Sequence, residues 1–163
     1  MVRFLIQPPF PANIESDLGV KIKEELKRQE LHLNYDPLDS VYRPWYKIPY
    51  KVNFRKKVWP RGARTNLLLR RISIASLKRN GEDRTINDLI DAITHETGHI
   101  DIAPVGIPLL WIGLIYTYNR FDDPIKGLIV TAGAIVAYHF IIGELVVHAY
   151  NTLKYGAKKY WSI

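Results

Sequence analysis

Two uncharged apolar runs, separated by a short polar turn, dominate the second half of this chain. Residues 102–118 and 127–143 contain no Asp, Glu, Lys or Arg, and the polar stretch 119–124 lies between them. Each run is slightly shorter than the roughly 20 residues with which a helix spans a bilayer. We therefore expect a helical hairpin that inserts into a membrane or lies embedded at its surface. The alternative is a pair of helices buried in a soluble core.

The first half has the mixed pattern of a small α+β fold. Residues 2–7 predict a short strand that ends at two prolines, and a helix is expected over roughly 17–30. The clearest strand pattern lies at 65–77, where Ile72 and Ile74 fall on the same, mostly apolar face. We expect a single domain over 1–163, with a basic α+β part (1–101), an apolar hairpin part (102–150) and a tail (151–163).

A helix that follows this strand begins at a capping box. Thr85 and Asp88 have the spacing with which a side chain and a backbone N–H satisfy each other at a helix start. Apolar residues then recur at helical spacing as far as His99. The helix therefore carries the sequence His95-Glu96-Thr97-Gly98-His99, an H-E-x-x-H motif.

The H-E-x-x-H motif points to zinc chemistry. Two histidines four residues apart lie on one face of a helix, so both imidazoles can reach one Zn²⁺. Glu96 points to the side, where it can act as general base towards a water. The alternative is a surface helix with two solvated histidines. The chain has no Cys, so any further ligand is His, Asp or Glu.

A catalytic zinc needs a third protein ligand, and Glu144 is the best candidate. It is the only Asp, Glu, Lys or Arg between Leu128 and Tyr150, and a carboxylate in apolar surroundings needs a cation or a partner. His148, one helical turn later, is either a neighbour of a ligand, an oxyanion donor or the third ligand itself. The remaining downstream candidates are Asp101, Asp122, Asp123 and His139.

This arrangement resembles the gluzincin clan of zinc metallopeptidases over about residues 65–151. The small size is similar to that of archaeal minigluzincins. The apolar hairpin between motif and third ligand resembles the integral-membrane gluzincins, the CAAX prenyl protease and bacterial heat-shock protease group. Those enzymes usually have an Asp four residues after the ligand Glu, where this chain has His148.

The resemblance implies a metalloendopeptidase that holds Zn²⁺ by His95, His99 and Glu144, with Glu96 as general base. His148 is the expected catalytic partner at the oxyanion. The strand carrying Ile72 and Ile74 is expected to bind an extended peptide, and Tyr150 is a further candidate contact to the substrate. The partners implied are a peptide or protein substrate and membrane lipids.

The net charge of +7 leaves two other classes open. Eighteen of the 23 basic residues precede His95, and basic and aromatic residues interleave at 42–59. This segment suits lipid headgroups or stacked bases, or it is a solvated basic face. A non-proteolytic zinc protein is one alternative, and a basic membrane- or nucleic-acid-associated adaptor is the other, with nucleic acid the less favoured partner. By the positive-inside rule, the N-terminal part is expected on the cytoplasmic side.

Overall fold

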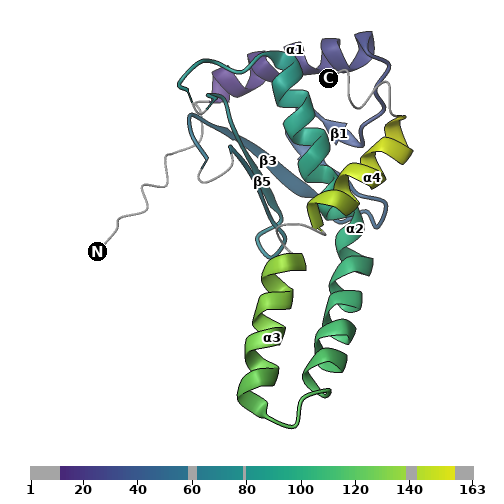
Figure 1. Ribbon diagram of the computed structural model, residues 1–163. Helices are drawn as coiled ribbons and strands as arrows, with labels where there is room; N and C mark the ends of the chain where they lie inside the picture. Colours follow the sequence, from purple (N-terminus) through teal and green to yellow (C-terminus); the bar gives the residue numbers. More distant parts are fainter. Residues whose placement is uncertain (1–11, 59–61, 79, 139–142, 157–163) are drawn as a thin grey trace.

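A five-stranded mixed sheet packs against two helices, and a helical hairpin projects from this body (Figure 1). The computed structural model describes residues 12–58, 62–78, 80–138 and 143–156. The helices and strands in these residues are α1 (Ala12–Arg28), β1 (Tyr35–Asp36), β2 (Val41–Tyr42), β3 (Tyr50–Arg55), β4 (Ala63–Asn66), β5 (Arg71–Ala75), α2 (Ile86–Tyr118), α3 (Pro124–Ala137) and α4 (Gly143–Tyr155). The predicted α+β class is confirmed. The strand predicted at 2–7 lies outside the described residues.

The sheet has the strand order β1-β2-β3-β5-β4, in which β3 and β5 are parallel and the other neighbours are antiparallel. The prediction of one strand over 65–77 was wrong, because the chain turns back at 67–70 and forms β4 and β5. The Asn66 side chain closes this turn by accepting a hydrogen bond from the Leu69 N–H at 2.9 Å. Arg70 has a φ of 49°, which completes the reversal. Among the described strands, β4 therefore forms the edge of the sheet beside β5.

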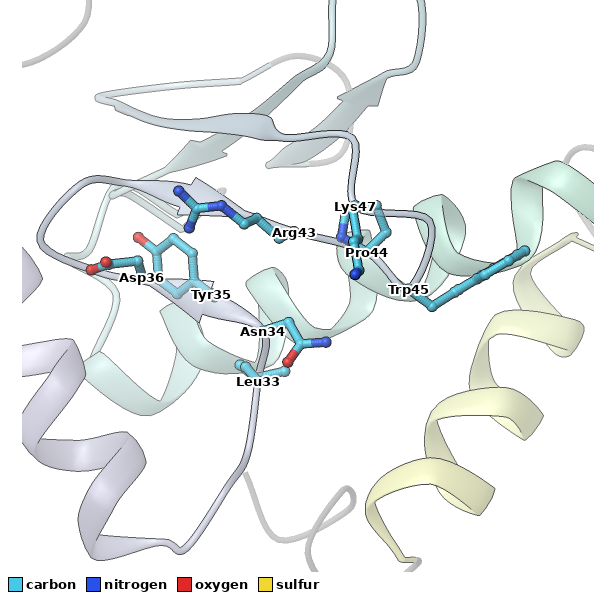
Figure 2. Close-up of a pocket in the computed structure, with 8 residues that line it drawn as sticks. All are labelled: Leu33, Asn34, Tyr35, Asp36, Arg43, Pro44, Trp45 and Lys47. Atoms are coloured by element: carbon cyan, nitrogen blue, oxygen red, sulfur yellow. The ribbon is translucent and has the colours of Figure 1, made fainter.

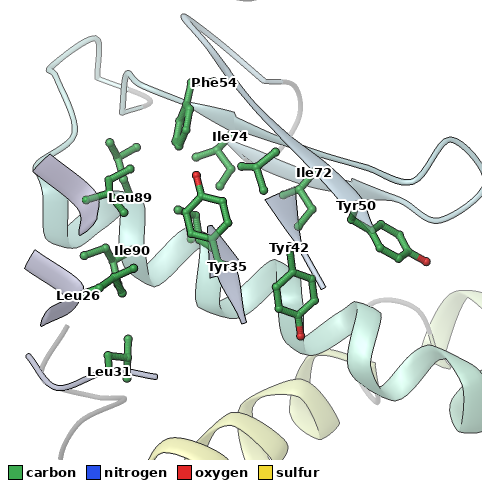
Figure 3. Packing of buried hydrophobic residues seen from close by; sticks show 14 of the residues in the cluster. Leu26, Leu31, Tyr35, Tyr42, Tyr50, Phe54, Ile72, Ile74, Leu89 and Ile90 are labelled. Carbon is green, nitrogen blue, oxygen red and sulfur yellow. The ribbon is translucent and has the colours of Figure 1, made fainter. Parts of the chain in front are cut away.

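The hydrophobic core lies between the sheet and the helices (Figure 3). Val52, Phe54, Ile72 and Ile74 from the sheet are completely buried against Ile90 and neighbouring residues of α2. The prediction that Ile72 and Ile74 contact substrate is therefore wrong. Their side chains belong to the core, and their strand is hydrogen-bonded on both sides.

Helix α2 is longer than its pattern predicted. It begins at the capping box, where the Asp88 N–H donates to the Thr85 hydroxyl and the Thr85 N–H donates to the Asp88 carboxylate. The helix then continues for 33 residues without interruption to Tyr118, despite two internal prolines at 104 and 108. The first arm of the hairpin is thus the continuation of the motif helix.

The hairpin is exposed along most of its length. Its second arm is α3, which ends at Ala137. Glu144 was expected on this arm because its sequence neighbours are apolar, but it lies on the separate helix α4. Large apolar side chains of both arms, such as Trp111, Ile112, Leu128 and Ile129, are each at least 60% exposed. Within the described residues, α2 is the one helix long and apolar enough to cross a membrane, and only 17% of that stretch is buried. This exposure contradicts two helices buried in a soluble core and is a weak indication of membrane association.

Candidate metal centre

Helices α2 and α4 bring both histidines of the motif against Glu144. The His95 Nε2 atom lies 2.9 Å from one carboxylate oxygen of Glu144, and the His99 Nε2 atom lies 3.8 Å from the other. The three side chains are 22–28% exposed, so the cluster is open to solvent on one side. Glu144, the expected third ligand, thus lies against the motif helix, and it is carried by α4 and not by the hairpin arm.

His148 lies in the same cluster, one turn after Glu144. Its ring centroid is 5.0 Å from that of His95, and the ligand atoms of His95, Glu144 and His148 all lie within 4.8 Å of one another. These three side chains form a group that could bind a metal ion. His99 is also close, because its ring centroid is 5.0 Å from that of His95. His99 therefore adjoins the group of three potential ligands that α2 and α4 bring together.

Burial sets the charge state of His95. The loss of hydration, reinforced by the nearby His148, outweighs the attraction of Glu144 and lowers the pKa of His95 below its ordinary value. The imidazole is therefore held in the neutral form, which is the form that binds metal ions. Asp91 lies one turn before His95, and its charge acts on both His95 and His148.

Glu96 is held by the sheet. Its side chain is 7% exposed, and the Thr65 hydroxyl of β4 donates a hydrogen bond of 2.6 Å to its carboxylate. The motif helix thus directs His95 and His99 towards α4, while Glu96 meets the edge strand. Sequence reasoning missed Thr65, because a lone threonine 31 residues before Glu96 carries no local signal.

A buried carboxylate fixes α4 in place. Asp101 is 5% exposed, and it accepts hydrogen bonds from Tyr42 at 2.6 Å, Tyr150 at 2.9 Å and Lys154 at 2.6 Å. Burial and the bond to this carboxylate raise the pKa of Tyr42 far above its ordinary value. Tyr150, which was expected to contact substrate, instead uses its hydroxyl to bind Asp101. Asp101 was also a candidate metal ligand. Its hydrogen bonds instead hold α2, α4 and β2 together.

Gly98 allows α4 to approach the motif helix closely. A Cβ atom at this position would lie 2.7 Å from the Asn151 Nδ2 atom, 2.8 Å from its Oδ1 atom and 3.0 Å from a Val147 methyl group. Asn151 is fully buried and donates a hydrogen bond of 3.1 Å to the Thr94 carbonyl. The glycine therefore sets the distance between the two helices that carry the cluster.

The other ligand candidates lie apart from this cluster. Asp123 caps α3 at the far turn of the hairpin by accepting a hydrogen bond from the Ile125 N–H at 2.9 Å, and Asp122 is its neighbour. His139 lies outside the described residues. Among the described residues, the cluster thus contains the motif histidines, Glu144 and His148.

A surface pocket of about 430 Å³ is formed by residues other than those of the cluster (Figure 2). It is lined by Leu33, Asn34, Tyr35, Asp36, Arg43, Pro44, Trp45 and Lys47, and none of these residues offers a side chain to the histidine cluster. Its Asp36 carboxylate is engaged by the backbone N–H of Leu38 at 3.0 Å. This pocket and the α2–α4 contact are therefore two separate candidate sites. Comparison with protein-family models, curated proteins and solved structures gives no match for this chain.

Proposed function

We propose that this protein is a membrane-associated zinc metallopeptidase that hydrolyses peptide bonds. The observation that carries the proposal is the position of the Glu144 carboxylate, which faces His95 and His99 together. In a tetrahedral site with bonds of 2.0–2.1 Å, neighbouring ligand atoms are about 3.4 Å apart. The His95 separation of 2.9 Å and the His99 separation of 3.8 Å, each to a different carboxylate oxygen, lie on either side of this value. Two imidazoles and a carboxylate are also a ligand set typical of catalytic zinc.

In this proposal, zinc would lower the pKa of a water and polarise the scissile carbonyl when it is bound by His95, His99 and Glu144. Glu96 takes a proton from the attacking water and passes it to the amine that leaves. Thr65 restricts the rotation of the Glu96 carboxylate, because it donates to one of the two oxygens. This hydrogen bond would thereby hold the general base in one orientation during the reaction.

The edge strand β4 is the best candidate for binding the substrate backbone. Its Thr65 donates a hydrogen bond to the proposed general base Glu96, and the strand lies beside β5 at the edge of the described sheet. An extended peptide that adds to a sheet edge is recognised mainly through its backbone hydrogen bonds. Strand β4 therefore takes the substrate-binding role that was expected for the strand with Ile72 and Ile74.

The exposed hairpin supports a location at a membrane. The apolar part of α2 begins a few residues after His99, so an embedded hairpin would place the cluster close to the bilayer surface. The basic residues of the N-terminal part favour its location on the cytoplasmic side. An embedded protein would sediment with membranes and resist extraction by alkaline carbonate, whereas release of the protein without detergent would contradict this location.

The enzyme is tested with full-length protein purified in detergent, by measuring zinc content and cleavage of a quenched fluorescent peptide library. Glu96→Gln should keep about one zinc per chain and lose at least 100-fold in cleavage rate. Glu144→Ala should lose both zinc and activity. Glu82→Gln, an exposed carboxylate beyond β5, is the matched control and should change neither. Cleavage by Glu96→Gln at the wild-type rate would refute the role of the base.

A metal site without catalysis is the second candidate, and His148 is the observation in its favour. If His95, His99, Glu144 and His148 all bound zinc, no position would remain for water. A closed site predicts that His148→Ala weakens zinc binding as much as His99→Ala does. The proposed open site predicts that His148→Ala retains zinc with less than a tenfold loss of affinity.

A further inference from the structure

Two surface turns lie beside the root of the hairpin, at the end of the sheet where β3 and β5 begin. One comprises residues 44–47 and the other residues 67–70, and the Lys51 N–H beside the first donates to the Arg70 carbonyl of the second at 2.9 Å. The parallel register of Lys51 with Arg71 places both turns at this same end. We call the exposed side chains there the root surface, which comprises Trp45, Lys47, Ile48, Leu68, Leu69 and Arg70.

The root surface faces in the direction of the hairpin. Trp45 donates its indole N–H to the Asp101 carbonyl at 2.9 Å, and Tyr46 donates to the Ile100 carbonyl at 3.3 Å. These carbonyls lie immediately before the apolar part of α2. Thr65, two residues before the second turn, contacts Glu96 one turn earlier on the helix. From Thr65 to the second turn, the chain therefore runs in the same direction as α2 does towards the hairpin.

The second turn presents apolar side chains to solvent. Leu68 is 95% exposed and Leu69 is 63% exposed, while Arg70 and Arg71 directly after them are also exposed. Across the sheet end, Trp45 is 61% and Ile48 is 39% exposed, with the cation of Lys47 between them. Each turn thus combines large apolar side chains with a cation. This combination suits the headgroup region of an anionic bilayer, where apolar side chains reach the acyl chains and cations meet phosphates.

We propose that the root surface is a second membrane contact, in which Leu68 and Leu69 insert among the headgroups of an anionic leaflet, while Arg70 and the adjacent Arg71 of β5 bind lipid phosphate. It is continuous with the hairpin and carries the charge that this lipid surface attracts. The inference rests on the membrane location proposed above. It adds a specific orientation, because the domain then has two separate attachments and the α2–α4 cluster is held at a fixed height above the lipid.

The absence of Cys from the chain permits a direct test with single introduced cysteines. Leu68→Cys, Trp111→Cys in the hairpin and Glu82→Cys at the opposite end of β5 are each labelled with the environment-sensitive dye NBD. The full-length proteins are reconstituted in vesicles of phosphatidylcholine and phosphatidylglycerol (3:1), with and without spin-labelled lipid. The Leu68 probe should be quenched at least threefold more than the Glu82 probe, and the Trp111 probe should be quenched by labels deep in the acyl chains.

Each outcome has a distinct meaning. If Trp111 is quenched and Leu68 is quenched no more than Glu82, the root surface does not touch lipid and the inference is overturned. A blue shift at Leu68 without lipid quenching overturns it equally, since protein then covers the turn. If Leu68 is quenched and Trp111 is not, the surface contact stands and the embedded hairpin fails. If neither is quenched, both proposals fail.

The lipid charge is tested with paired reversals. Arg70→Glu/Arg71→Glu should reduce quenching of the Leu68 probe at least twofold in vesicles that contain phosphatidylglycerol. Lys56→Glu/Lys57→Glu makes the same change in net charge with exposed residues at the opposite end of β3, and it should leave the quenching unchanged. Equal effects of the two pairs would show that net charge alone, and not the root surface, draws the domain to the bilayer.

Discussion

Replacing Gly98 by Ala should separate the two helices that form the cluster. From helix propensity alone, the change would stabilise α2 by about 1 kcal/mol. The structure predicts the opposite sign, because the new methyl group would lie 2.7 and 2.8 Å from the two terminal atoms of Asn151 and 3.0 Å from Val147. Ordinary contacts of this kind are about 3.5 Å or longer. Helix α4 must therefore move by about 0.5 Å or more, or its buried side chains must leave their rotamers.

Such overpacking costs about 1–3 kcal/mol, which exceeds the gain in propensity. The displacement would also shift the candidate ligand Glu144, since Asn151 lies two turns after it on the same helix. Loss of an interaction that orients a ligand weakens metal affinity by about 10- to 100-fold. We expect Gly98→Ala to lower the thermal midpoint of the metal-free protein and to reduce zinc affinity at least tenfold. Both are measurable in detergent, by thermal unfolding and by competition with a chelating dye.

Gly113 supplies the matched control, because a Cβ atom on that glycine of the same helix would meet nothing within 4 Å. Gly113→Ala should leave zinc affinity unchanged. The double variant Gly98→Ala/Asn151→Ala removes the two shortest contacts and should recover part of the lost affinity. If Gly98→Ala binds zinc as tightly as the wild type does, α4 is not held at the distance described, and the argument that Gly98 positions Glu144 is refuted.

Three further predictions concern the contacts around the cluster. Asp101→Ala leaves buried Tyr42 and half-buried Tyr150 without their acceptor, so urea unfolding should show a loss of about 3 kcal/mol or more, whereas Glu82→Ala should show almost none. Thr65→Val should retain zinc and lower the cleavage rate about tenfold, because Glu96 loses its hydrogen-bond donor; an unchanged rate would exclude this orienting role. Since burial lowers the pKa of His95, protonation favours the unfolded state, and the zinc-free protein should lose thermal stability as the pH falls through about 6.5. His95→Gln should flatten this dependence, and an equally steep profile in that variant would assign it to another group.

Local sequence signals predicted the start of the motif helix and the identity of the cluster. The capping box depends only on Thr85 and Asp88, three residues apart, so it could be recognised without any tertiary contact. Glu144 stood out because an isolated carboxylate in an apolar stretch needs a partner.

The remaining features depend on contacts between distant segments. Asp101 binds Tyr42, Tyr150 and Lys154, which are 49–59 residues away, and no periodicity relates them. The division of 65–77 into two strands was missed because the turn after Asn66 contains three leucines, so no polar stretch separates the two strands. Its signal is the Asn side chain, which competes for backbone N–H groups and favours turns. Gly98 was recognised as part of a motif, but its packing role appears only when α4 is in place.

The two prolines of α2 have a mechanical consequence for the cluster. Pro104 has no N–H, so the Ile100 carbonyl four residues earlier has no helical donor, and the Tyr46 hydroxyl binds it instead. Trp45 binds the next carbonyl, that of Asp101. The helix is therefore clamped to the sheet domain just before the segment in which its hydrogen-bond ladder is weakest. If the hairpin is embedded as proposed, a tilt that matches it to a thinner or thicker bilayer would bend the helix at Pro104 and Pro108. The arrangement of His95, His99 and Glu144 would then be unaffected by the tilt, and the same site geometry would be kept in membranes of different thickness.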